Sequence, residues 1–343
     1  MRFFCCACNH SFTPKLNNLS YGCSISNNIK NLITLEFFNR ISFSDIARRY
    51  NVSVTTVFNI FDNRFPFVPR NSLPSILCID EFHFSKSYDQ NYCCAIVDLK
   101  SKKIVDILKN RKKAYLNEYF DSINYDERSK VRYFISDLYD EYRLIRKKFF
   151  PHAIHIADRF HIVIQITRAI NKRRVKVMNS VKHSNKILYN FMKKNWQLFE
   201  RSSHSIPDKE YKNKETRIIY SYDQLFYDCL KLDNDLNIAY EVLQKIIRLK
   251  KQPSNNVVDF FDKINKVLKN CNDIDIQKVG DTYKKWIVEI CNAYSREALD
   301  NHLSNSIAEN TNNHIKTIIK VSYGINNFQR LRKRALIISN TKR

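Results

Sequence analysis

Glycine is scarce in this chain, whose 343 residues include only Gly22, Gly280 and Gly324. A phosphate-binding P-loop and a dinucleotide-binding fingerprint both need several glycines close together, so we expect no nucleotide partner. Long apolar runs are also missing, because none reaches the roughly 20 residues that span a bilayer. The first residues lack the apolar segment of a signal peptide. We therefore expect a cytoplasmic protein with no membrane partner.

Acidic residues are outnumbered: 58 Lys and Arg stand against 34 Asp and Glu, a formal net charge of +24. A surplus of this size repels itself unless a counter-charge is bound, and nucleic acid is the usual one. An AT-rich coding sequence would also raise the lysine content without any function. The arginine-dense stretch from Arg168 to Lys176 fits that explanation poorly. The charge balance predicts a polyanionic partner.

Ten cysteines are scattered along the chain, several of them in apolar runs typical of a reduced protein core. Cys5 and Cys8 have the spacing of a zinc knuckle, but a tetrahedral zinc site needs four ligands. His10 and Cys23 are possible completions at irregular spacing. We expect metal-free cysteines here, with a Zn²⁺ site as the alternative.

Hydrophobic periodicity and proline content divide the chain into six segments. The predicted fold class is α/β: a ribonuclease H-like mixed sheet core with a long all-helical insertion, preceded by a small helical helix-turn-helix domain. The segments are a partial zinc-ribbon-like N-terminus (1–24), the helix-turn-helix (25–66), a linker (67–75), the first part of the core (76–164), the helical insertion (165–295) and a final helical region of the core (296–338).

The core segment predicts five strands and two helices, in the order strand–strand–strand–helix–strand–helix–strand typical of a ribonuclease H-like sheet. The predicted strands are Ile76–Asp80, Tyr92–Leu99, Lys103–Leu108, Val131–Ser136 and Ala153–Ala157, and the predicted helices are Tyr115–Ile123 and Asp140–Phe149.

Three acidic residues are candidate metal ligands and catalytic residues. Asp80 and Asp137 directly follow apolar runs that read as buried strands, and Glu309 lies in a helix-like segment far downstream. Neighbouring strand ends would bring the two aspartates together, and the last helix would deliver Glu309. Carboxylates are the ligands that Mg²⁺ prefers, and two such ions drive in-line attack on a phosphodiester. The alternative is that each acid is a solvated residue.

A helix-turn-helix is predicted over residues 44–61. Its first helix would begin after Ser44 as N-cap, and its second helix would follow Ser53 as N-cap. In such a motif the second helix presents outward residues to base edges in the DNA major groove. The residues expected to contact DNA are Arg48, Arg49, Thr55, Thr56 and Asn59. A plain helical hairpin is the alternative.

Further basic residues are expected to contact DNA phosphates without reading sequence. They are Arg168, Lys172, Arg173 and Arg174 on a predicted helix, and Lys316, Arg330 and Arg332 near the C-terminus. A solvated basic face is the rival explanation. Asp158 and His161 follow the fifth predicted strand, and we expect them to support the active site rather than to bind metal directly.

Four stretches resemble the motifs of one family: Ile79-Asp80-Glu81-Phe82, Ala157-Asp158-Arg159-Phe160-His161, residues 304–316 around Glu309, and residues 322–332. The chain resembles the ISL3 group of bacterial insertion-sequence DDE transposases along roughly its whole length. That family usually carries a further cysteine pair upstream, which this chain lacks.

The resemblance implies catalytic roles for Asp80, Asp137 and Glu309 with two Mg²⁺ or Mn²⁺ ions. It implies cleavage and strand transfer of double-stranded DNA, with the helix-turn-helix binding the terminal inverted repeats. A homodimer is expected in the DNA complex, because two element ends must be joined to target DNA in one event, and the protein would act on the nucleoid. Two alternatives stay open: a catalytically inactive, repressor-like DNA-binding copy, and a ribonuclease H-like nuclease.

Overall fold

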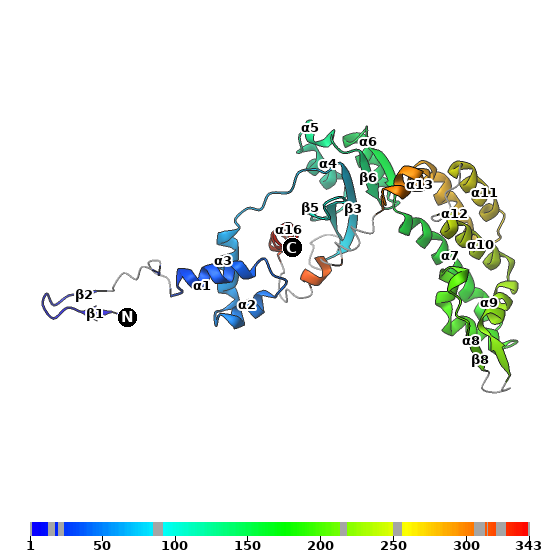
Figure 1. The fold of residues 1–343 in the computed structure, drawn as a ribbon, viewed down its shortest axis with the longest axis horizontal. Helices are drawn as coiled ribbons and strands as arrows, with labels where there is room; N and C mark the ends of the chain where they lie inside the picture. The colour runs from blue at the N-terminus through cyan, green and yellow to red at the C-terminus, as the bar shows by residue number, and fades with distance from the viewer. Residues whose placement is uncertain are drawn as a thin grey trace. The chain divides into compact units, whose positions relative to one another are not determined.

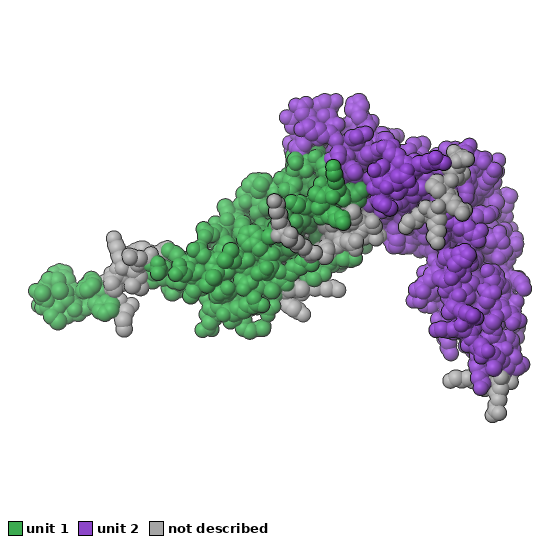
Figure 2. Space-filling view, in the orientation of Figure 1, with its two compact units in different colours: residues 1–74, 80–118, 307–343 green, residues 75–79, 119–306 purple. Residues whose placement is uncertain are grey.

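The computed structural model describes residues 2–12, 18–19, 24–84, 92–212, 218–249, 256–304, 313, 315–319 and 327–341. The chain divides into two compact units, coloured separately in Figure 2. The first unit comprises residues 1–74, 80–118 and 307–343, and the second comprises residues 75–79 and 119–306. The division passes through one strand of the central sheet, so each unit carries part of that sheet.

The N-terminal residues form a small hairpin of β1 (Phe3–Phe4) and β2 (Ser11–Phe12), which pair antiparallel. Three helices follow it in the chain (Figure 1): α1 (Asn27–Glu36), α2 (Phe43–Arg49) and α3 (Val54–Arg64). Their shared core is aromatic, since the Phe37 ring lies edge-on to Phe61 at 5.0 Å and to Phe43 at 5.7 Å between centroids. Such pairs add stabilisation beyond the area they bury.

Helix α2 begins earlier than the sequence predicted. The N-cap is Ser42, whose Oγ accepts from the Asp45 amide at 2.9 Å, so the prediction of Ser44 is wrong. The earlier start places Phe43 inside the helix, where its side chain is buried. The predicted cap of α3 is confirmed: Ser53 Oγ accepts from the Thr56 amide at 3.0 Å. Between the helices, Asn51 adopts a left-handed φ of 49°, which asparagine tolerates better than most residues.

The central sheet has five strands in the order β5-β4-β3-β6-β7. Strand β3 pairs parallel with β6, β6 pairs parallel with β7, and β4 pairs antiparallel with β5, so the sheet is mixed as predicted. All five predicted strands are present, with ends shifted by up to three residues. They are β3 (Ile76–His83), β4 (Tyr92–Asp98), β5 (Ile104–Leu108), β6 (Tyr133–Ser136) and β7 (Ile154–Ala157).

Three helices lie in the chain between β5 and β7. Helix α4 spans Lys113–Asp121, α5 spans Tyr125–Arg128 and α6 spans Asp140–Phe149. The predicted bounds of α6 are confirmed. Its apolar residues Tyr142, Ile145 and Phe149 recur at helical spacing and are buried, which explains why the helix could be read from the sequence.

The insertion is mostly helical but not all-helical as predicted. It contains a short antiparallel hairpin, β8 (Glu210–Lys212) with β9 (Ile219–Ser221), whose alternating pattern is too short to be read from the sequence. The other elements are α7 (Arg159–Ser180), α8 (Lys186–Lys194), η1 (Trp196–Glu200), η2 (Ser203–Ser205), α9 (Tyr222–Lys231), α10 (Asn234–Leu249), α11 (Val257–Lys269), α12 (Ile274–Lys285), α13 (Ile287–Ala293) and α14 (Arg296–Asp300).

Helix α7 crosses the predicted boundary between core and insertion at residues 164 and 165 without a break. Within the second unit it packs against α10 and α12. Arg173 joins them: its Nε and Nη2 donate to Asp233 at 2.8 and 2.6 Å, and its Nη1 donates to Asp273 at 3.3 Å. The core and the insertion are therefore continuous at this point rather than separated by a linker.

The last described helix, α16 (Phe328–Asn340), lies in the first unit. Arg334 is buried there and donates through Nη2 to the carbonyl oxygens of Asn39 and Ile41, at 2.9 and 2.8 Å. Neighbouring basic side chains of α16 pair with acids of the same unit. No helix among the described residues combines the length and apolar character needed to cross a membrane.

Candidate active site

The register of the sheet places three aspartates just beyond the last paired residues of its parallel strands. Cys78 of β3 is opposite Ile135 of β6, so Asp80 and Asp137 each lie two residues beyond a shared register position. Ser136 is opposite Ala157, so Asp137 and Asp158 each follow the last paired residues of β6 and β7. Since alternate residues of a strand face the same side of a sheet, Asp80 and Asp137 are placed on one side.

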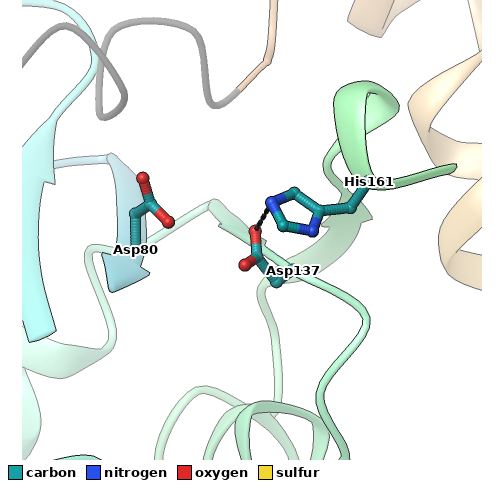
Figure 3. A group of neighbouring side chains, drawn as sticks. All are labelled: Asp80, Asp137 and His161. Carbon is teal, nitrogen blue, oxygen red and sulfur yellow. Dashed lines mark ion pairs between the residues drawn. The ribbon is translucent and has the colours of Figure 1, made fainter. Parts of the chain in front are cut away.

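Asp80, Asp137 and His161 form a group of possible metal ligands (Figure 3). One ligand atom from each of these side chains lies within 4.8 Å of the others. His161 Nε2 is 3.1 Å from Asp137 Oδ1, and Asp80 is buried. Among the described residues this is the only cluster of three or more His, Cys, Asp and Glu side chains with such geometry. The two predicted aspartates are therefore brought together.

His161 reaches this group because Asp158 begins helix α7. Asp158 is the N-cap residue, and its carboxylate accepts from the Phe160 amide at 3.4 Å. The Asp158 amide donates to the Ser136 carbonyl at 2.9 Å, which ties the start of the helix to strand β6. His161 then lies in the first turn. Asp158 therefore fixes the start of α7, and His161 lies within the ligand group, whereas the sequence predicts only a supporting role for it.

The electrostatic setting of His161 keeps its imidazole neutral. Burial, together with the nearby Arg168 guanidinium, lowers the pKa of His161 to about 4. At neutral pH the contact with Asp137 is therefore between a neutral imidazole and a carboxylate, and is not a salt bridge. A neutral imidazole has one N–H donor and one free nitrogen, so it can orient a carboxylate or act as a metal ligand.

The donor set fits a divalent cation. Carboxylate oxygens are the ligands preferred by Mg²⁺ and Mn²⁺, and Asp80 and Asp137 each present one oxygen to the same space. Imidazole nitrogen suits softer transition metals better than it suits Mg²⁺. With Mg²⁺, the better role for His161 is therefore to hold Asp137 in place. The third predicted acid, Glu309, lies outside the described residues.

Several basic residues predicted to contact DNA form hydrogen bonds or ion pairs within the protein instead. Arg174 is buried and donates to the Met192 carbonyl at 2.8 Å, so the prediction of a phosphate contact is wrong for this residue. Arg173 is held by the aspartates described above. In the first unit, Arg332 pairs with buried Asp106 and Arg330 pairs with Asp62, both at 2.6 Å. Helical spacing alone could not show that acids from distant segments neutralise these charges.

Other predicted contact residues remain on the surface. Arg48 has a side chain that is 81% exposed, although it pairs with Asp45, and Arg49 pairs with Glu36 while 55% exposed. Thr56 is half-buried, and its hydroxyl lies 2.9 Å from that of Ser53. The remaining exposed residues are Thr55, Asn59, Arg168, Lys172 and Lys316. Lys172 is exposed although it pairs with Asp275 at 2.9 Å.

Cys5 and Cys8 lie beside the turn of the N-terminal hairpin. His10 is also near, with Nδ1 2.7 Å from the Cys8 carbonyl oxygen. These residues do not appear in a cluster of three ligands within the part of the chain that the structure describes. Cys23, the other completion considered above, lies outside that part.

The comparisons with known proteins identify the family of this chain. A family model described as a transposase, of the DDE ISL3 group, matches residues 77–335. The match covers most of the chain and includes all three residues of the ligand group. The protein is therefore a transposase. More narrowly, it belongs to the ISL3 family of DDE transposases. A search of curated proteins found none that matches this chain.

Proposed function

We propose that this transposase cleaves and joins DNA at the ends of an insertion sequence, with Asp80 and Asp137 as metal ligands. One observation carries the proposal: these two carboxylates meet just beyond the last paired residues of β3 and β6 in a chain of the DDE family. Glu309 lies within the family match and is proposed as the third acid.

Neighbouring residues of the chain would hold the two carboxylates in position to bind two divalent ions, Mg²⁺ or Mn²⁺. Such ions, when bound, activate a water or a 3′-hydroxyl and stabilise the leaving oxygen of a phosphodiester. Asp158 caps α7 and so places His161 against Asp137. The N-terminus of α7 also carries a partial positive charge, which favours ionised carboxylates nearby.

We propose that α2 and α3 act as a helix-turn-helix that binds the terminal inverted repeats. Thr55 and Asn59 are exposed on α3, as base-reading residues must be. A cavity of about 450 Å³ lies between α1 and α3, lined by Thr56, Asn59, Lys30 and Arg64 among others. Its polar and basic lining suits a nucleic-acid backbone or base edge.

Arg168, Lys172 and Lys316 are proposed as phosphate contacts, because all three are exposed. Their contribution would fall as salt concentration rises. A homodimer is proposed for the DNA complex, since joining two element ends requires two active sites. The protein would work in the cytoplasm, associated with the nucleoid.

The test is cleavage and joining of a labelled element-end duplex with Mg²⁺ or Mn²⁺. Wild type is compared with Asp137→Asn, and Asp140→Asn serves as the matched control. Asp140 is three residues further on, exposed, and paired with Lys285 at 2.6 Å. We expect wild type and Asp140→Asn to release a 3′-hydroxyl and to join it, and Asp137→Asn to do neither.

Other outcomes would point to the alternatives. Specific binding without cleavage by any of the three proteins would favour a repressor-like copy. Cleavage of an RNA–DNA hybrid in preference to the DNA duplex would favour a ribonuclease H-like nuclease. Equal cleavage by wild type and Asp137→Asn would remove Asp137 from the ligand set.

A further inference from the structure

A buried polar chain runs from the helical insertion to the main chain of Asp137, entirely within the second unit. Glu289 of α13 lies with Oε1 3.6 Å from His155 Nδ1. His155 Nε2 lies 2.9 Å from Ser136 Oγ, and the same hydroxyl lies 3.0 Å from the Asp137 carbonyl oxygen. The sequence did not predict this connection between Glu289, His155, Ser136 and the main chain of Asp137.

The order serine, histidine, glutamate is also that of a hydrolase triad. This chain cannot act in that way, because Ser136 is completely buried and His155 is only 4% exposed. No substrate can reach the hydroxyl. Its remaining role is to connect the carboxylate of Glu289 with the backbone beside Asp137.

Glu289 is itself held firmly. Arg143 of α6 donates to both carboxylate oxygens at 2.8 Å, and its guanidinium lies 3.8 Å from the ring centroid of Trp286. Asn292 of α13 donates to the His155 carbonyl at 2.8 Å. The insertion is therefore docked on α6 and β7, the elements that follow Asp137 in the chain.

We propose that Glu289 is a positioning residue for the metal site, acting on Asp137 through His155 and Ser136. A carboxylate beside Nδ1 favours the imidazole tautomer with its hydrogen on that nitrogen. Nε2 is then an acceptor that competes with the Asp137 carbonyl, 3.0 Å from the same hydroxyl, for the Ser136 hydrogen. Without the carboxylate, the tautomer with its hydrogen on Nε2 becomes available, and the hydroxyl then donates to the Asp137 carbonyl alone. Glu289 thus selects one of two hydrogen-bond arrangements at the residue that carries the metal ligand.

This inference rests on the proposed role of Asp137 as a ligand, and the experiment is a metal titration of DNA cleavage. Wild type is compared with Glu289→Gln and Ser136→Ala. Mutating a residue that hydrogen-bonds to a metal ligand typically lowers metal affinity or activity about 10- to 100-fold. We expect both variants to need about 10- to 100-fold more Mg²⁺ for half-maximal cleavage, with unchanged affinity for the element-end duplex.

Asp233→Asn is the matched control, because it also removes one carboxylate of a bidentate arginine pair in the insertion. It should lower thermal stability without moving the metal titration. The double variant Glu289→Gln/Ser136→Ala should be no more impaired than either single variant, because the two residues act in series.

The outcomes separate this inference from the proposed function. If Asp137→Asn retains full cleavage, the proposed function fails. If Asp137→Asn is inactive but both Glu289→Gln and Ser136→Ala titrate like Asp233→Asn, the positioning role is overturned. Additive effects in the double variant would also overturn it. Should Glu289→Gln fail to fold, Ser136→Ala alone decides, because it leaves the Arg143 pair intact.

Discussion

His161 Nε2 lies 3.1 Å from Asp137 Oδ1, and the two side chains come from a strand end and the first turn of the helix after the next strand. Asp137 already has a second contact on its main chain, since its carbonyl oxygen accepts from the Tyr139 amide at 2.8 Å. The aspartate is thus constrained at both its backbone and its carboxylate.

Replacing His161 with glutamine should impair metal-supported cleavage by about 10- to 100-fold, because Asp137 loses a partner that orients it. If His161 only orients Asp137, Mg²⁺ and Mn²⁺ should be affected alike. If it is a ligand, the loss should be greater with Mn²⁺, which accepts nitrogen ligands more readily. The measurement is the cleavage rate against the concentration of each ion. His152→Gln, at an exposed position, is the control and should behave as wild type.

Arg174 and Arg168 lie on the same helix but should respond differently to truncation. Arg174→Ala leaves the Met192 carbonyl without its donor, which costs about 1–3 kcal/mol of unfolding free energy, and DNA affinity should not change. Arg168→Ala should leave stability unchanged and lower the slope of log affinity against log salt by about 1. The measurements are urea unfolding and duplex binding at several salt concentrations. A salt slope that changes for Arg174→Ala would contradict the burial argument.

Arg334→Ala should destabilise the first unit strongly. The substitution removes the donor to Asn39 and Ile41 and the guanidinium that lies 4.6 Å from the Phe43 ring centroid. Hydrogen bonds from a charged donor contribute about 1.5–3 kcal/mol each, and the substitution removes two of them. The measurement is the midpoint of thermal unfolding, with the half-buried neighbour Lys333→Ala as control. A similar small shift for both variants would refute a structural role for Arg334.

The second unit should lose stability in acid through Glu289. Burial opposes ionisation of this side chain, but the nearby His155 imidazole and the hydrogen bonds from Arg143 outweigh burial and lower the pKa of Glu289 to about 2. A carboxyl group with a depressed folded pKa contributes stability above its unfolded pKa, near 4.3, and loses it as the pH falls toward 2. The contribution at pH 7 is about 3 kcal/mol.

Urea unfolding followed by tryptophan fluorescence at pH 7, 5 and 3 would measure this loss, since Trp286 lies against Arg143. We expect wild type to lose stability between pH 5 and 3 more steeply than Glu289→Gln does. Parallel curves for the two proteins would show that Glu289 is not the group that titrates.

The sequence predicted most of the sheet because its strands are short apolar runs that end at turn residues or acids. The parallel pairing of β3 and β6 places Asp80 and Asp137 at equivalent register positions. The strand pattern and the sheet topology together therefore locate these two candidate ligands. The N-cap of α2 was missed because both Ser42 and Ser44 are good caps, and only the burial of Phe43 distinguishes them.

Long-range pairings were beyond the reach of sequence patterns. Nothing in the segment around Arg173 shows that Asp233 and Asp273 will neutralise it, because those acids come from other helices. The same holds for Glu289 and His155, which lie more than a hundred residues apart in the chain. Local periodicity reports which face of a helix is apolar, whereas the partner of a charge depends on how the helices pack.

Helix α7 has a mechanical consequence for the candidate site. It runs unbroken for 22 residues, about 33 Å at 1.5 Å per residue, with His161 in its first turn and Arg173 clamped to α10 and α12 further along. A continuous helix of this kind transmits tilt rather than absorbing it. Helix α7 therefore joins the turn that carries His161 and the packing against α10 and α12 through one unbroken run of backbone hydrogen bonds, so a rigid displacement of both helices together would be carried along α7 to His161.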